Sequence, residues 1–221
     1  MKKLVIWLNV LLIVTLCTAN YFYLTPGGGA SKAFCSGCFA ALGAVNALCV
    51  LIRGGKRLFA VVMALGLLLA MGGDLRIGPS FVQGAALFAG GHICFWLGYQ
   101  LLMKPKWKDW LWTLLLLIPG AAYLLFSRRL VFIPGWMRWV CLGYAVIISL
   151  MTGKALAGFC RQPGWLTGML ALGSVLFFFS DLMLLLNMFG GFGRVYGILC
   201  MSTYYPAQLL LAHSIFHTAR Q

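Results

Sequence analysis

Residues 165–188 read WLTGMLALGSVLFFFSDLMLLLNM, an apolar run of 24 residues that holds one charged side chain, Asp181. A run of about 20 apolar residues is long enough to cross a lipid bilayer as an α-helix. A second acid, Asp74, lies in a similar run, within Met71-Gly72-Gly73-Asp74-Leu75. A carboxylate at the centre of a membrane helix costs roughly 2.5–3.5 kcal/mol, so such residues face a bundle interior and mark functional sites. The alternative for each acid is a structural role, paired to an arginine or a hydroxyl.

The composition of the chain is that of a membrane protein. Hydrophobic residues make up 62% of its 221 residues and charged residues 9%, whereas a soluble domain carries about 25% charged residues. The net charge of +14 would by itself suit nucleic-acid binding. The Lys and Arg residues, however, stand singly or in short clusters between apolar runs and form no basic face and no nucleic-acid-binding motif. We therefore predict a membrane helix bundle and no nucleic-acid partner.

Eight apolar runs are candidates for spanning helices, separated by short connections rich in Gly, Pro and basic residues. They cover residues of about 4–24, 33–52, 58–77, 81–103, 107–126, 131–157, 165–188 and 194–216. No connection is long enough for a soluble domain, so we predict an all-α polytopic membrane bundle, with residues 1–221 as a single transmembrane domain. The first run is too long for a signal peptide and lacks a cleavage site, so we interpret it as a helix that is retained.

The distribution of basic residues predicts the orientation of the bundle. With the N-terminus inside, eleven of the 17 Lys and Arg residues fall on the inner side and six on the outer side. Because inner loops of membrane proteins carry the excess of Lys and Arg, both termini are predicted to be cytoplasmic.

The two acids are predicted to lie at the same depth. Each is 16 residues beyond the start of its run, at residues 58 and 165, which is about 24 Å along a helix. Both runs point outward, so Asp74 and Asp181 are expected in the outer half of the membrane. We expect polar residues of the runs 58–77, 81–103, 165–188 and 194–216 to meet there in one cavity, and the other four runs to contribute less. The third acid, Asp109, is expected in a loop beside lysines.

Several polar residues lie where they can surround this cavity. Tyr204 and Gln208 share one helix face because they are four residues apart, and Pro206 between them frees a backbone carbonyl. His92 has two possible roles: a hydrogen bond across helices, or the donation, acceptance or orientation of a proton in a site.

The sequence gives no support for a metal site. Cys35 and Cys38 form a CxxC pair, but no second pair completes a zinc site, and small apolar cysteines are common in membrane helices. His213 and His217 are four residues apart and lack an evident third ligand. We therefore predict neither a metal nor a cofactor.

Three parts of the chain resemble the lysoplasmalogenase (YhhN-like) family of multi-pass membrane proteins. The matching residues are Gly73-Asp74 with Phe81, Gly84, Phe88, His92 and Tyr99; Leu176-Phe177 and Ser180-Asp181 through Asn187 and Phe189; and Thr203-Tyr204-Tyr205-Pro206-Ala207-Gln208-Leu209, with Ser31-Lys32 before the second run. Together they span about half of the chain in matching order. Two departures are Ala33, where many relatives have proline, and Pro206, which is often aliphatic in the family.

The resemblance implies hydrolysis of the vinyl ether bond of lysoplasmalogens, which yields a fatty aldehyde and glycerophosphocholine or glycerophosphoethanolamine. Such a bond is cleaved by protonation of carbon, which creates an oxocarbenium ion, so a general acid and a second carboxylate suit it. Asp74 and Asp181 are the predicted pair, with water and a lysophospholipid as reactants. The expected orienting residues are His92, Tyr204, Tyr205, Gln208, Asn187 and Ser180. The expected ligands of the head-group phosphate are Lys32, Arg76 and Arg194.

Two alternatives remain from the residues alone. One is a proton-coupled transporter or lipid-binding protein whose buried acids relay protons. The other is a metal-dependent hydrolase of the seven-helix ceramidase type, which needs three converging histidines. Short loops favour a bacterial cytoplasmic membrane, although the resemblance also allows the eukaryotic endoplasmic reticulum. The oligomeric state is not predicted.

Overall fold

The computed structural model describes residues 2–25, 29, 31–191 and 193–220, and within them the chain forms eight α-helices. The helices are α1 (Lys2–Leu24), α2 (Lys32–Arg53), α3 (Arg57–Arg76), α4 (Phe81–Leu102), α5 (Lys108–Phe126), α6 (Met137–Arg161), α7 (Trp165–Phe189) and α8 (Arg194–Phe216). The prediction of an all-α fold is therefore confirmed.

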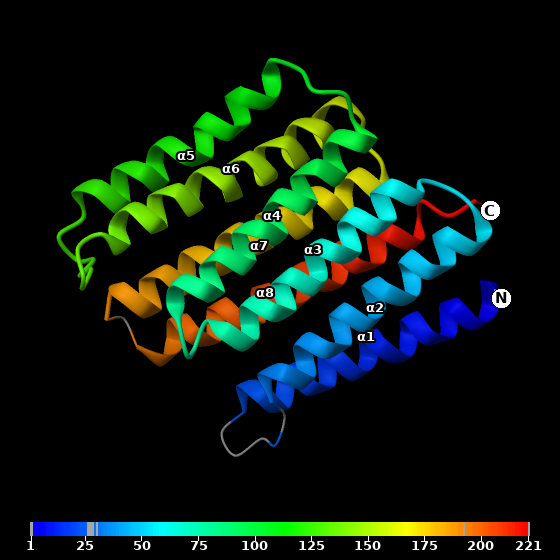
Figure 1. Cartoon of the computed structure of the whole chain (residues 1–221), viewed down its shortest axis with the longest axis horizontal. Helices are drawn as coiled ribbons and strands as arrows, with labels where there is room; N and C mark the ends of the chain where they lie inside the picture. Colours follow the sequence, from blue (N-terminus) through cyan, green and yellow to red (C-terminus); the bar gives the residue numbers. More distant parts are fainter. Residues whose placement is uncertain (1, 26–28, 30, 192, 221) are drawn as a thin grey trace.

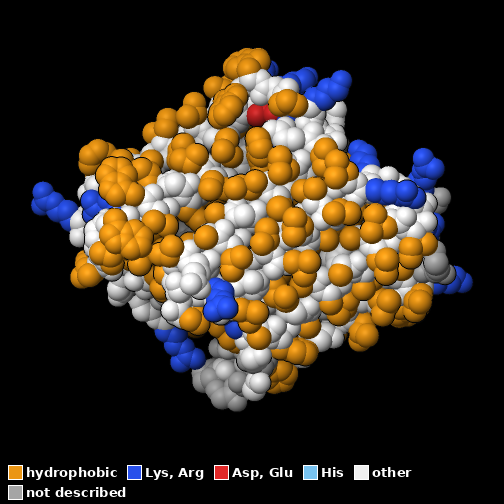
Figure 2. All heavy atoms as spheres, viewed as in Figure 1, with side chains coloured by type: hydrophobic (Ala, Val, Ile, Leu, Met, Phe, Trp, Pro, Cys, Tyr) orange, Lys and Arg blue, Asp and Glu red, His pale blue; other side chains and the backbone are white. Residues whose placement is uncertain are grey.

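Seven of the described helices, α1 to α7, are long and apolar enough to cross a membrane. Figure 2 shows apolar side chains over the middle of one face of the molecule, with most Lys and Arg near the ends of the helices. Helix α8 is less apolar because polar side chains such as Gln208 and Ser214, both fully buried, face the interior of the bundle. The eighth spanning helix thus stays a prediction.

The helices run up and down through the bundle, and both termini lie at the same end (Figure 1). We call this the termini end and the other the opposite end, where α1, α3, α5 and α7 finish. Helix α8 is central and packs against α1, α2, α3 and α7. After α8, the backbone of Thr218 and Arg220 hydrogen-bonds to the turn at Gly54 and Lys56, which fixes the C-terminal segment to the start of α3.

Small residues let the central helices approach closely. A Cβ added to Gly66 of α3 would lie 2.6 Å from the Phe95 ring and 3.1 Å from the carbonyl oxygen of Gly91 on α4. Close contact of this kind stabilises the association of membrane helices through van der Waals packing. Lipid tails are as apolar as the side chains, so there is no hydrophobic driving force between helices.

Helix α6 begins later than the predicted run 131–157, at Met137, and ends later, at Arg161. Pro134 disfavours helical backbone at the residue before it. Residues 127–136 instead fold over the opposite end, where the Val131 amide donates to the Phe189 carbonyl at 2.8 Å. Leu130 and Phe132 of this segment are buried.

The expectation that Asp109 lies in a loop beside lysines is wrong. Asp109 is buried in the first turn of α5, and its ion-pair partners come from α6, whereas the neighbouring Lys106 donates only its backbone amide, at 3.0 Å. Lys154 Nζ lies 2.8 Å from Asp109 Oδ2, and Arg161 pairs with Oδ1. Lys154 is only 1% exposed, and its ammonium group also donates to the Lys104 carbonyl at 3.2 Å. This cluster fastens α5 to α6 at the termini end.

Replacing Asp109 with Asn should destabilise the protein strongly, because it leaves the buried Lys154 without a counter-charge. Breaking one partner of a buried ion pair costs about 3–5 kcal/mol, so the thermal unfolding temperature in detergent should fall clearly. The double variant Asp109→Asn/Lys154→Met should recover much of the loss. Wild-type unfolding of the single variant, or no recovery in the double variant, would contradict this account.

Candidate functional site

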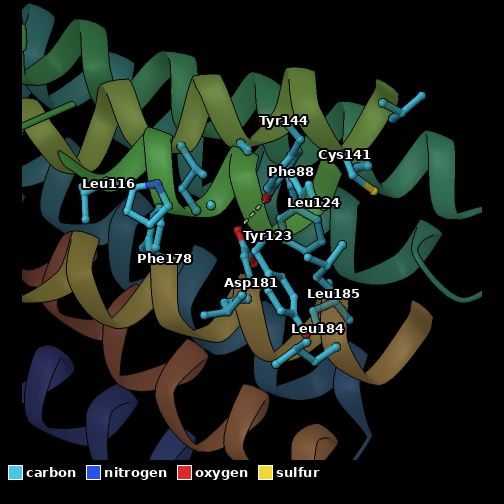
Figure 3. A pocket seen from close by; sticks show the side chains of 18 of the residues that line it. Phe88, Leu116, Tyr123, Leu124, Cys141, Tyr144, Phe178, Asp181, Leu184 and Leu185 are labelled. Carbon is cyan, nitrogen blue, oxygen red and sulfur yellow. Dashed lines mark hydrogen bonds between the residues drawn. The ribbon is translucent and has the colours of Figure 1, made fainter. Parts of the chain in front are cut away.

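A cavity of about 610 Å³ lies near the opposite end of the bundle (Figure 3). Helices α4, α5, α6 and α7 supply nearly all of its wall, which is mostly apolar. Among the described residues that line it, Asp181 is the single acid. Ligand pockets typically measure 300–1,000 Å³ and combine apolar walls with a few placed polar groups. The cavity has that character.

Asp181 of α7 is held by two polar side chains from other helices. The Tyr144 hydroxyl of α6 donates to Asp181 Oδ2 at 2.6 Å, as Figure 3 shows. His92 Nε2 of α4 lies 3.1 Å from the same oxygen and 2.7 Å from the Tyr144 oxygen. Asp181 Oδ1 accepts no hydrogen bond from the residues that the structure describes. One carboxylate oxygen is thus fixed and the other is available.

The His92 ring is fully buried and rigidly placed. It packs edge-on against Phe177, with ring centroids 4.6 Å apart, and against Tyr144 at 5.3 Å. If Nε2 carries the proton, it can donate to both of its neighbours, the Tyr144 hydroxyl oxygen and Asp181 Oδ2. Nδ1 has no hydrogen-bond partner among the described residues, so in this tautomer it is a free acceptor.

Asp74 of α3 lies in a second polar cluster with different chemistry. Lys32 Nζ lies 3.0 Å from its Oδ1. Its Oδ2 accepts hydrogen bonds from Ser36 at 2.5 Å and from Tyr204 at 2.8 Å. The partners come from α2 and α8, and Asp74 itself is only 5% exposed. A neighbouring cation and two hydroxyl donors stabilise the charged form of a carboxylate.

The predicted single cavity shared by both acids is wrong. Asp74 is not among the residues that line the cavity. Two aromatic rings connect the clusters instead: Phe177 packs against both His92 and Tyr204, and Phe88, which lines the cavity, packs against Tyr204. The acids occupy adjacent clusters joined by aromatic packing, because bulky rings fill the space between the helices.

The other four predicted orienting residues lie in different surroundings. Tyr205 is buried, with its hydroxyl 3.5 Å from the Lys32 carbonyl. Gln208 is fully buried, but forms no hydrogen bond to either carboxylate. Ser180 points to Cys200, with Oγ and Sγ 3.6 Å apart. Asn187 is half-buried near the end of α7. The side chains that hydrogen-bond to Asp181 are instead those of His92 and Tyr144.

The predicted phosphate ligands also differ among themselves. Lys32 is engaged by Asp74 and is therefore not a free cation. Arg76 and Arg194 are exposed at the opposite end, and neither forms an ion pair with a described residue. Of the three predicted ligands, these two arginines remain available to a phosphate.

Two residues of the site were missed from the sequence, Ser36 and Tyr144. The expectation that the first, second, fifth and sixth runs contribute less is wrong for the last three, since α2 supplies Lys32 and Ser36, and α5 and α6 line the cavity. Lys32 and Ser36 are four residues apart and share a helix face, a signal that was available. Tyr144 offered none, because a single tyrosine in an apolar run also suits a membrane interface.

No group of three His, Cys, Asp or Glu side chains is placed to hold a metal among the described residues. His213 instead belongs to a polar network, with Nδ1 3.1 Å from Asn9 Oδ1. Asn9 and Asn46 exchange hydrogen bonds of 2.7 and 2.9 Å. The network joins α1, α2 and α8, so these polar side chains connect helices.

Comparison with known proteins identifies a family but no individual relative. No curated protein and no solved structure matches the chain. The model of the YhhN family matches residues 30–215, a range that contains both acid clusters and the cavity. The chain is therefore a helical membrane protein that belongs to the YhhN family.

Proposed function

We propose that the chain is a membrane-embedded hydrolase that cleaves the vinyl ether bond of lysoplasmalogens. The observation that carries the proposal is Asp181, a carboxyl group with one free oxygen in the wall of an apolar cavity. The YhhN family includes lysoplasmalogenases. The substrate, a single-chain lipid, suits an apolar cavity in a membrane protein. The products are a fatty aldehyde and glycerophosphocholine or glycerophosphoethanolamine.

In the proposed reaction Asp181 acts first as the acid. Its proton goes to the vinyl carbon farther from the ether oxygen, and the electrons of the double bond form the new C–H bond. The resulting oxocarbenium ion lies beside the Asp181 carboxylate, which Tyr144 and His92 hold in place. A fixed negative charge next to a developing cation stabilises the transition state without reorganisation.

In the second half, Asp181 acts as the base. Water adds to the carbon next to the ether oxygen, and the carboxylate accepts a proton from that water. The hemiacetal then transfers its hydroxyl proton to the glycerol oxygen and breaks the C–O bond. The aldehyde and the glycerophosphate ester leave, and Asp181 is protonated again. A single carboxyl group therefore completes the proton balance.

Asp74 has a different proposed role, as a positioning residue. Its charge is matched by Lys32, and it does not line the cavity. Through Tyr204 it fixes one end of the aromatic packing that continues through Phe177 to His92. This revises the predicted acid and base pair into one reacting carboxyl and one supporting carboxylate. Arg76 and Arg194 remain the proposed ligands of the head-group phosphate.

The second candidate function is a proton-coupled lipid transporter. The Lys32–Asp74 pair, in which the carboxylate is buried, favours it, since ionisable residues that pair within a membrane mark proton relays. Production of aldehyde by the purified protein separates the two functions, because a transporter moves its substrate unchanged.

We further propose that α8 spans the membrane with the other seven helices, with both termini in the cytoplasm of a bacterium and the cavity in the outer half. Its 23 residues measure about 34 Å, enough to cross a core of about 30 Å. A reporter that fluoresces only in the cytoplasm should therefore be bright when fused to the C-terminus and dark when fused after Ser127. The opposite pattern would refute this orientation.

Asp181→Asn should reduce kcat for lysoplasmalogen by about 10²–10⁴-fold, since the amide cannot replace a general acid. Asp74→Asn should also lower the rate, because the positioning of Tyr204 is disturbed. Adding Lys32→Met to Asp74→Asn should restore part of the activity, as the partly buried cation is removed with its partner. If the double variant is no better than the single one, or if Asp181→Asn stays active, these roles are wrong. Aldehyde release by folded, purified variants is the measurement.

Tyr144→Phe keeps the ring and removes the hydroxyl that bonds to Asp181. A hydrogen bond to a charged group contributes about 1.5–3 kcal/mol, so kcat should fall about 10- to 100-fold. Tyr21→Phe is the matched control, because Tyr21 is exposed on α1 and its ring packs only on Phe22 among the described aromatic residues. Equal rates for the two variants would remove Tyr144 from the site.

A further inference from the structure

Helix α5 forms one wall of the cavity but is attached to the bundle along one side only. Among the described helices, its backbone packs against α6 and no other. It nevertheless supplies Leu115, Pro119, Gly120 and Tyr123 to the cavity wall. The space between α5 and the helices α4 and α7 is therefore bridged by side chains and by the cavity, without direct backbone packing.

The wall formed by α5 is also part of the outer surface. Leu115 is 62% exposed, Tyr123 is 37% exposed, and Pro119 between them is exposed as well. These residues are spaced four apart and share one face of the helix. Since the same side chains line the cavity and lie on the surface, the cavity reaches the surface along this stripe. In a membrane, that surface faces lipid.

The stripe has its smallest side chains and a missing backbone hydrogen bond at Pro119-Gly120. Proline carries no N–H and cannot bond to the Leu115 carbonyl. A Cβ added to Gly120 would meet no atom within 4 Å. Nearer the termini end, α5 is fixed to α6. The backbone of Thr113 lies against Gly153, and Asp109, one turn before Thr113, pairs with Lys154.

Gly120 also lies at the depth of the reacting group. It is six residues from the end of α5, Tyr144 is seven residues from the start of α6, and Asp181 is eight residues from the end of α7. These ends lie together at the opposite end of the bundle (Figure 1). The three residues are thus level to within about one helical turn.

We propose that the hydrocarbon chain of a membrane lipid passes between α5 and the core of the bundle at Gly120. We call the stripe Leu115, Pro119 and Tyr123, with Gly120, the α5 portal. Its occupant is an aliphatic chain because the rim and the cavity are apolar and the rim faces the bilayer. The inference rests on the proposed function in one respect: the chain must carry its reacting bond to Asp181. Gly120 is then a residue that determines specificity for long chains.

The kinetic test compares Gly120→Leu with Gly143→Leu. Both glycines lie in membrane helices, and a Cβ at either meets nothing within 4 Å, but Gly143 does not line the cavity. Gly120→Leu should lower kcat/KM at least tenfold for a long-chain lysoplasmalogen and less than twofold for an analogue with a propenyl chain. Gly143→Leu should change neither. Equal losses on long and short chains would overturn the proposal.

A binding test separates the portal from the proposed hydrolysis. The probe is a saturated ether lysolipid, which cannot be hydrolysed, with a photoreactive diazirine in its chain. Adducts in the full-length protein should fall within residues 115–124 and should be lost in Gly120→Leu but kept in Gly143→Leu. Adducts elsewhere, for example at the apolar hollow between α1 and α2 that contains Val14 and Phe34, or no adducts, would refute the portal. Labelling at α5 without any aldehyde release would refute the hydrolysis alone.

Discussion

Every acidic side chain of this protein lies among apolar helices, Asp74 and Asp109 buried and Asp181 partly exposed at the cavity, and each must therefore find side-chain partners on other helices. The sequence has three acids. Asp74 joins α3 to α2 and α8, Asp109 joins α5 to α6, and Asp181 joins α7 to α4 and α6. A lone carboxylate in hydrocarbon is too costly to tolerate, so these contacts constrain which helices are neighbours. Helix α1 is tied in by amides instead, through Asn9 and Asn46.

The same residue type serves different purposes because its partners differ. Asp74 and Asp109 each face a cation, and these ion pairs hold helices together. Asp181 has a phenol and an imidazole as partners and keeps one oxygen free at a cavity. Of the three, Asp181 alone is among the residues that line the cavity, which is why the proposed proton transfer is assigned to it. The cation-paired acids hold helices in place: Asp74 bonds to Tyr204 in the aromatic packing next to His92, and Asp109 fixes α5 to α6 at the termini end.

Much of the fold could be predicted from hydropathy, because apolar runs between short polar connections leave few alternatives to spanning helices. The importance of Asp74, Asp181 and His92 could also be predicted, since isolated polar groups in such runs are costly. The distinct roles of the acids could not. Hydropathy does not say which helices are neighbours. The partners of Asp109 lie 45 and 52 residues away in sequence, and the adjacent lysines were expected in their place. Lys32 was expected to meet a head-group phosphate because it lies on the predicted outer side with the acids, and the structure pairs it with Asp74 instead.

The central claim is that a carboxyl group in the cavity protonates a vinyl carbon of the substrate. Turnover of lysoplasmalogen by the purified protein in D₂O tests it most directly, with the fatty aldehyde analysed by mass spectrometry. The account requires one deuterium on the carbon next to the aldehyde group, and loss of this product in Asp181→Asn. An absence of aldehyde, or an aldehyde that carries no deuterium at that carbon, would contradict it.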